Sequence, residues 1–63
     1  MPDEITISVT LTEEQALAYA QFLKRAGFSD YASNSVDKDE AYLMVDAGER
    51  LRTALARVGF APR

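Results

Sequence analysis

The sequence lacks cysteine and histidine entirely over its 63 residues. Without cysteine the chain can form no disulfide and no thiolate metal site, and without histidine it has no imidazole base that titrates near neutral pH. The Ser–His and Cys–His pairs that activate nucleophiles are therefore excluded. Only three glycines occur, scattered at Gly27, Gly48 and Gly59, so there is no glycine-rich phosphate-binding loop. We expect a protein that is not an enzyme and that binds no cofactor and no metal.

Long apolar runs are also missing, since no stretch reaches the ~18 apolar residues that a membrane-spanning helix needs. The sequence starts with MPDE, which is acidic and unlike the basic start of a signal peptide. We therefore expect a cytoplasmic protein. A chain of 63 residues is expected to form a single domain, 1–63, of marginal stability, and such a small domain gains from oligomerisation or from docking on a partner.

Basic side chains are few and unevenly distributed. Residues 1–49 contain all ten acidic side chains and three basic ones, a balance of −7, whereas residues 50–63 contain four arginines and no acid. The net charge of −3 argues against non-specific binding to nucleic acid or to anionic membranes, because both require a basic surface. It is compatible with a basic protein as the partner.

Residues 5–11, with the sequence ITISVTL, alternate strictly between apolar and polar side chains. This period of two and the β-branched composition predict a half-buried β-strand. A lone strand leaves backbone groups unpaired, so it must pair with a second strand of this chain or of another copy. A homodimer through strand 5–11 is therefore one expected arrangement.

Residues 13–26 carry the signals of an amphipathic helix. Thr12 and Gln15 match a capping box at its start. Gly27 is expected to take the left-handed conformation that ends a helix, with Phe28 folding back onto it. The side chains expected to face the core share one side of this helix: Ala16, Tyr19, Ala20, Leu23 and Ala26.

The second half of the chain predicts an irregular segment or a single helical turn at 29–36, followed by a long helix at 38–58. Asp37 is the expected N-cap, Glu40 lies three residues after it, and Gly59 is expected to end the helix. The apolar residues of this helix recur with a period of 3.6 residues. They are Ala41, Met44, Gly48, Leu51, Leu55 and Val58, with Leu43, Ala47 and Ala54 widening the stripe.

The predicted fold class is a small α+β domain with the order β-α-α. The alternative is β-α-β-β-α, in which residues 31–36 and 41–45 form a hairpin and Asp46 caps a shorter helix. Gly48 favours the alternative, because glycine costs about 1 kcal/mol in a helix interior. The unbroken period from Ala41 to Val58 favours the long helix.

The candidate binding residues belong to an acid-rich stretch, residues 30–49, which contains six acidic side chains and a single basic one, Lys38. One interpretation is a solvated helix surface whose acids pair with Arg50 and Arg52, three or four residues further on. The other is a recognition surface that presents negative charge and an exposed tyrosine to a basic partner. The candidate residues are Asp37, Asp39, Glu40, Tyr42, Asp46 and Glu49.

The stretch ITISVTLTEEQALAYAQFLKRAGFS, residues 5–29, resembles the strand and first helix of ribbon-helix-helix proteins. The resemblance implies a dimer in which the strands pair across a two-fold axis and their outward residues read DNA. Here the outward residues Thr6, Ser8 and Thr10 include no arginine or lysine. The resemblance implies a dimeric regulator or antitoxin as the alternative function.

Taken whole, the short acidic chain resembles the small proteins of bacteriophages and other mobile elements, anti-CRISPR proteins among them. That resemblance implies a non-enzymatic inhibitor in the cytoplasm of a bacterial host cell. Its acidic surface would mimic DNA and block a nucleic-acid-binding site on a subunit of a CRISPR effector complex. The chain itself would contact neither nucleic acid nor a membrane.

Overall fold

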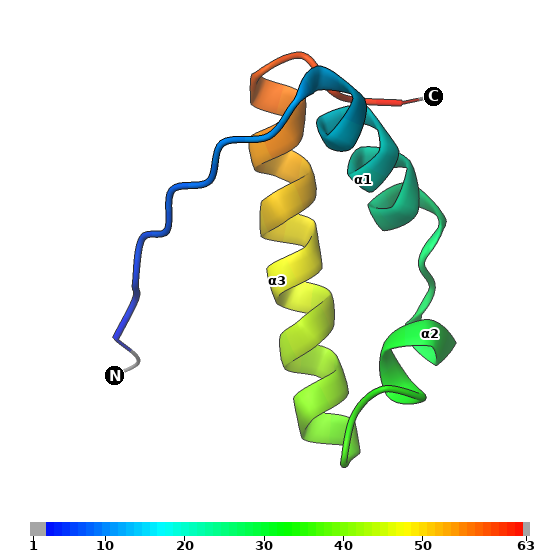
Figure 1. Cartoon of the computed structure of the whole chain (residues 1–63). Coiled ribbons are helices and arrows are strands. Elements are labelled where there is room, and N and C mark those ends of the chain that lie inside the picture. Colours follow the sequence, from blue (N-terminus) through cyan, green and yellow to red (C-terminus); the bar gives the residue numbers. More distant parts are fainter. Residues whose placement is uncertain (1–2, 63) are drawn as a thin grey trace.

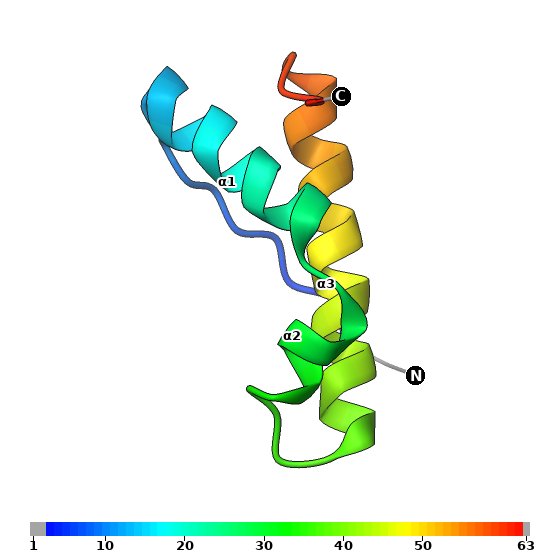
Figure 2. The same cartoon turned by 90° about the vertical axis from the view of Figure 1, so that its right-hand side faces the viewer.

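The computed structural model describes residues 3–62, and it contains three helices: α1 (Glu13–Arg25), α2 (Phe28–Ala32) and α3 (Lys38–Arg57). Helix α3 is the longest, and both α1 and α2 pack against it (Figure 1). Residues 3–12 form an extended N-terminal segment that runs beside α3, on the side away from α2 (Figures 1 and 2). None of the described helices is long and apolar enough to cross a membrane.

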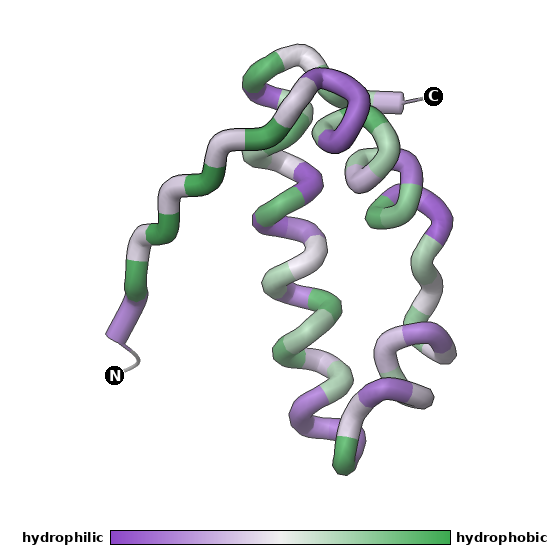
Figure 3. The backbone as a smooth tube through the Cα atoms, in the orientation of Figure 1, coloured by the Kyte–Doolittle hydropathy of each residue, from purple (hydrophilic) through white to green (hydrophobic). Residues whose placement is uncertain are grey.

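The predicted α+β fold is wrong, because no residue from 3 to 62 lies in a β-strand. Residues 5–11 are extended, as their alternation indicates (Figure 3), but their backbone makes no hydrogen bond within the described chain. The pattern specifies an extended backbone and cannot supply the second backbone that a strand requires. The hairpin alternative is also wrong, because residues 41–45 belong to α3 and Tyr31 belongs to α2.

Helix α1 begins as predicted and ends differently. The N–H of Gln15 donates to Thr12 Oγ1, and the N–H of Thr12 donates to Gln15 Oε1, each at 3.0 Å, which confirms the capping box. Gly27 is extended (φ −102°, ψ 175°) and is not left-handed. Its N–H donates to Asp30 Oδ2 at 2.8 Å, so Gly27 is the N-cap of α2 and does not terminate α1.

Helix α3 has the predicted capping residues at both ends. Asp37 Oδ1 accepts the N–H of Glu40 at 2.8 Å, and Gly59 is left-handed with φ 102°. The N–H of Phe60 reaches the carbonyl oxygen of Leu55 at 2.9 Å, which is the long hydrogen bond of a Schellman motif. The helix ends at Arg57, one residue before the predicted boundary.

The core lies where α1 and α2 meet α3, and it consists mostly of small residues. The buried apolar side chains are Ala16, Ala20, Leu23 and Ala41. Tyr19, predicted to face the core, is 45% exposed, and Leu51 and Val58 are also exposed. Gly48 is buried because the Tyr31 ring of α2 lies against it: a Cβ atom there would collide with the Tyr31 hydroxyl.

Candidate interaction surface

The six candidate residues lie at the N-cap of α3 and within residues 38–49 of the helix. Residues seven apart lie about two turns apart on the same side of a helix, so Asp46 follows Asp39 along α3 and Glu49 follows Tyr42. All six are exposed except Glu40, which is half-buried. The helix therefore displays the predicted side chains together, but it does not give them the same surroundings.

Two of the five candidate carboxylates form hydrogen bonds that begin α3. Asp37 Oδ1 accepts the N–H of Glu40, and Glu40 Oε1 accepts the N–H of Val36 at 2.9 Å. The first bond satisfies a backbone donor that the helix N-terminus leaves without a partner, and the second attaches Val36, the residue before the N-cap, to the first turn. Asp37 and Glu40 therefore have a structural role that accounts for them without a binding partner.

Tyr42 connects α3 to the beginning of α2. Its ring lies 5.1 Å from the Phe28 ring, centroid to centroid, with a tilt of 37° between the planes. The residue remains 54% exposed. Tyr42 thus stabilises the α2–α3 contact on one side of its ring and presents the remainder to solvent.

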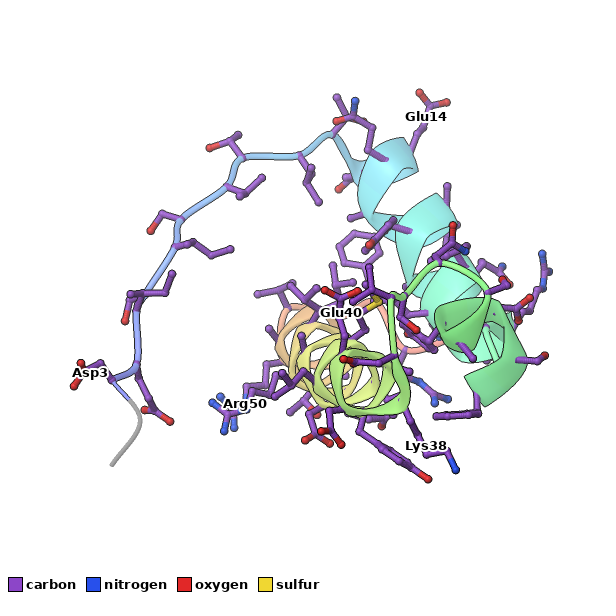
Figure 4. The ribbon with its side chains drawn as sticks, turned by 90° about the horizontal axis from the view of Figure 1, so that it is seen from below. Asp3, Glu14, Lys38, Glu40 and Arg50 are labelled. Carbon is purple, nitrogen blue, oxygen red and sulfur yellow. The ribbon has the colours of Figure 1, made fainter. Side chains whose placement is uncertain are left out.

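Ion pairing leaves part of the acidic surface unneutralised. The predicted pair Asp46–Arg50 does not form, because Arg50 Nη1 reaches Glu4 Oε2 of the N-terminal segment at 3.3 Å. Figure 4 shows Arg50 extending from α3 towards that segment. Glu49 Oε2 lies 4.0 Å from Arg52 Nη1, a long distance for an ion pair, and both side chains are exposed.

Asp39 and Asp46 have no ion-pair partner in the described part of the chain. Together with Glu49 they form what we call the acidic face of α3. From Asp39 to Glu49 this face extends about 15 Å along the helix axis.

The described residues place no three acidic side chains close enough to hold a metal ion. The absence of enzymatic activity, of a cofactor and of a bound metal remains a prediction from composition. What the acidic face can do chemically is attract and hold cationic groups at fixed positions along a rigid helix.

The structure also contains a groove that the sequence analysis missed. It has a volume of about 680 Å³ and lies between the N-terminal segment, α1 and α3. Its lining is apolar apart from one glutamine, and it consists of Val9, Leu11, Gln15, Ala18, Tyr19, Phe22, Leu51 and Leu55. The signal in the sequence is the width of the apolar stripe of α3, which Leu43, Ala47 and Ala54 extend beyond the row that contains Leu51 and Leu55.

Comparison with known proteins relates the chain to a family. The model of DUF7706, described as a family of unknown function, matches residues 1–63. No curated protein and no solved structure matches the chain.

Proposed function

We propose that this chain, which belongs to the DUF7706 family, is a non-enzymatic binding module that uses the acidic face of α3 to block a nucleic-acid-binding site on a basic partner protein. The observation that carries the proposal is the exposed and unpaired charge of Asp39 and Asp46. Both are exposed on a 20-residue helix, and neither has an ion-pair partner among residues 3–62. Their charges are therefore available to another molecule.

The spacing of the acidic face suits one strand of nucleic acid better than a duplex. Its three carboxylates span about 15 Å in two intervals, a mean spacing of roughly 7.5 Å, whereas duplex DNA carries about one charge per 1.7 Å and a single strand of it one per 3.4 Å. Lysine and arginine side chains that bind phosphates also bind carboxylates through charge-assisted hydrogen bonds. A protein groove that holds a single strand is thus the favoured target.

The most specific form of the proposal follows the resemblance to anti-CRISPR proteins. The partner would be a subunit of a CRISPR effector complex, and the chain would act in the cytoplasm of a bacterial host cell. Under this proposal the inhibitor competes with DNA and does not bind DNA itself.

The alternative is a regulator that touches DNA directly, of the ribbon-helix-helix kind. The observation in its favour is the exposed N-terminal segment, along which Thr6, Ser8 and Thr10 are accessible. Affinity for DNA comes largely from cations that contact phosphates, and residues 3–12 contain none. Arg50, which reaches the start of the segment, is paired with Glu4.

Gel-shift assays separate the two functions. The chain alone, mixed with double-stranded DNA, is expected to produce no shift. Added to a purified CRISPR effector complex with its target DNA, it is expected to release the DNA, and less efficiently as salt increases, because exposed charges are screened within about 8–10 Å. A shift by the chain alone would support the regulator instead.

The acidic face is tested with neutral, nearly isosteric substitutions. Asp46→Asn combined with Glu49→Gln should weaken inhibition at least about tenfold, since each change removes a charge-assisted contact. Glu13→Gln combined with Glu14→Gln changes the net charge equally at the start of α1 and should leave inhibition within about twofold. Full inhibition by the first variant, with an unchanged melting temperature, would show that the acidic face is not the binding surface.

A further inference from the structure

We infer that the apolar groove between the N-terminal segment, α1 and α3 is covered by a second copy of this chain, so that the protein is a homodimer. The first observation is the size of the core. Among residues 3–62 the buried apolar side chains are three alanines and one leucine, and no large side chain there is fully buried. Burial of apolar surface is the main favourable term in folding, and such a core supplies little of it.

The solvent-accessible surface of the chain, compared with that of a compact monomer, indicates how much area a second copy could bury. The chain exposes 5439 Å², whereas a compact monomer of 7.0 kDa is expected to expose about 4,000 Å². The excess, about 1,400 Å², exceeds the roughly 800 Å² per partner of a standard interface and lies in the range of permanent dimers. The radius of gyration agrees, being 12.7 Å against about 11 Å for a compact domain of this length.

The N-terminal segment forms a wall of this groove and does not fill it. Its start is attached to α3 through the pair Glu4–Arg50, and its end leads into the capping box of α1. Between these two points Val9 and Leu11 already line the groove, which nevertheless stays open. The segment also keeps Ile5 and Ile7 exposed, by 86% and 68%. The described residues therefore leave the groove open to an occupant from another molecule.

Two features favour a second copy over another partner. No charged side chain lines the groove, so two chains of net charge −3 can meet there without bringing like charges together. The segment is also self-complementary when two copies run in opposite directions about Ser8. Apolar then meets apolar and hydroxyl meets hydroxyl: Ile5 with Leu11, Thr6 with Thr10, and Ile7 with Val9.

The backbone supports the same arrangement. Residues 5–11 make no backbone hydrogen bond within the described chain, and their donors and acceptors would remain unpaired beneath any apolar partner. An antiparallel neighbour of the same sequence satisfies them symmetrically. The apolar faces of both segments then lie over the two grooves, and the acidic faces of the two α3 helices stay outside the contact.

Sedimentation equilibrium tests the dimer with a matched pair of variants on α1. Phe22 lines the groove and is 53% exposed, whereas Leu17, on the same helix, is 46% exposed and does not line it. The unmodified chain should have about twice the monomer mass of 7.0 kDa. Phe22→Glu should raise the dissociation constant at least about 100-fold, because it brings an unpaired carboxylate into an apolar contact, and Leu17→Glu should change it less than about threefold.

Cysteine cross-linking tests the geometry without disturbing the groove. The chain has no cysteine, so Ser8→Cys and Ser29→Cys each introduce a single thiol. Opposed residues of antiparallel segments have Cα atoms about 4.5–5.5 Å apart, within disulfide range, so Ser8→Cys should form a covalent dimer under mild oxidation. Ser29, at the start of α2, should not.

Three results would overturn the inference. They are a monomeric mass for the folded chain at tens of micromolar, equal weakening by Phe22→Glu and Leu17→Glu, and equal cross-linking at residues 8 and 29. None of these measurements involves an effector complex or the acidic face. The dimer and the proposed inhibitory function can therefore fail independently.

Discussion

Gly48 and Tyr31 meet where α2 packs on α3, and this contact explains a glycine in the middle of a helix. A Cβ atom at residue 48 would collide with the Tyr31 hydroxyl and lie 3.2 Å from Tyr31 Cζ. At the sequence level Gly48 favoured the hairpin alternative, because glycine weakens a helix. The structure shows the opposite: the glycine lets two helices approach each other closely.

We predict that the effect of Gly48→Ala changes sign with the residue at position 31. In the unmodified chain the substitution should lower the free energy of unfolding, because the Tyr31 ring must move away from α3. Combined with Tyr31→Ala, the same substitution should raise it by about 1 kcal/mol, the difference in helix propensity. Urea unfolding of the four proteins of this double-mutant cycle measures the coupling. An equal effect in both backgrounds would contradict the contact.

The acidic residues around the start of α3 are also expected to differ in how much each stabilises the fold. We predict that Asp37→Ala lowers the free energy of unfolding by about 1 kcal/mol, because it removes the acceptor for the N–H of Glu40. Asp39→Ala, two residues on and without a hydrogen bond or ion pair in the described chain, should change it by less than about 0.5 kcal/mol. Thermal unfolding of the two variants, monitored by circular dichroism, measures both losses. Equal losses would mean that the cap does not stabilise α3.

At the scale of elements, the two Gly-Phe pairs look alike in the sequence and act in opposite ways. Gly59 is left-handed and closes α3, whereas Gly27 is extended and opens α2. Asp30, three residues after Gly27, accounts for the difference, because its carboxylate accepts a hydrogen bond from the Gly27 N–H. After Gly59 no helix follows in the described chain, and the Schellman bonds form.

This difference predicts unequal effects of alanine at the two glycines. Gly59→Ala should destabilise the chain by about 1–2 kcal/mol, because a side chain is unfavourable in the left-handed region. Gly27→Ala should cost less, about 0.5–1 kcal/mol, because alanine is a poorer N-cap than glycine while φ −102° suits any residue and the nearest atom to the added Cβ is 3.9 Å away. Chemical denaturation of both variants provides the comparison. A larger loss at residue 27 would refute the assignment of the two ends.

At the scale of the whole molecule, each of the two long helices has apolar side chains that no other part of the described chain covers. Helix α1 buries Ala16, Ala20 and Leu23 against α3, while Tyr19 and Phe22 on an adjacent side face the groove with their rings stacked at 5.5 Å. Helix α3 likewise leaves Leu51 exposed. Folding and association are then expected to be a single process, in which the second copy completes the core.

We predict that the melting temperature depends on protein concentration. For a dimer that unfolds to separate chains, a tenfold increase in concentration should raise it by about 5 °C for two chains of this size. Circular dichroism melts at 5-fold and 50-fold dilution of one stock test this, with Phe22→Glu as the variant expected to lose the dependence. A melting temperature of the unmodified chain that does not change with dilution would argue for a stable monomer.

The sequence by itself determined the local structure. The capping box of Thr12 and Gln15, the Asp37 cap and the Gly59 stop are local interactions of residues a few positions apart, so they can be read from spacing. The positions of α1 and α3 follow from the same caps and from the period of 3.6 residues. Helical spacing also places Asp39, Asp46 and Glu49 on one side of α3, although it does not show which acids are already engaged in hydrogen bonds.

Only the tertiary structure decided how these elements are used. Alternation made residues 5–11 extended, but whether an extended segment becomes a strand depends on a neighbour that the segment's own pattern cannot specify. Arg50 pairs with Glu4, 46 positions away, and not with Asp46, because the N-terminal segment returns alongside α3. The groove arises in the same way: its walls are distant in sequence, and a helix with a broad apolar surface does not reveal which side its own chain will cover.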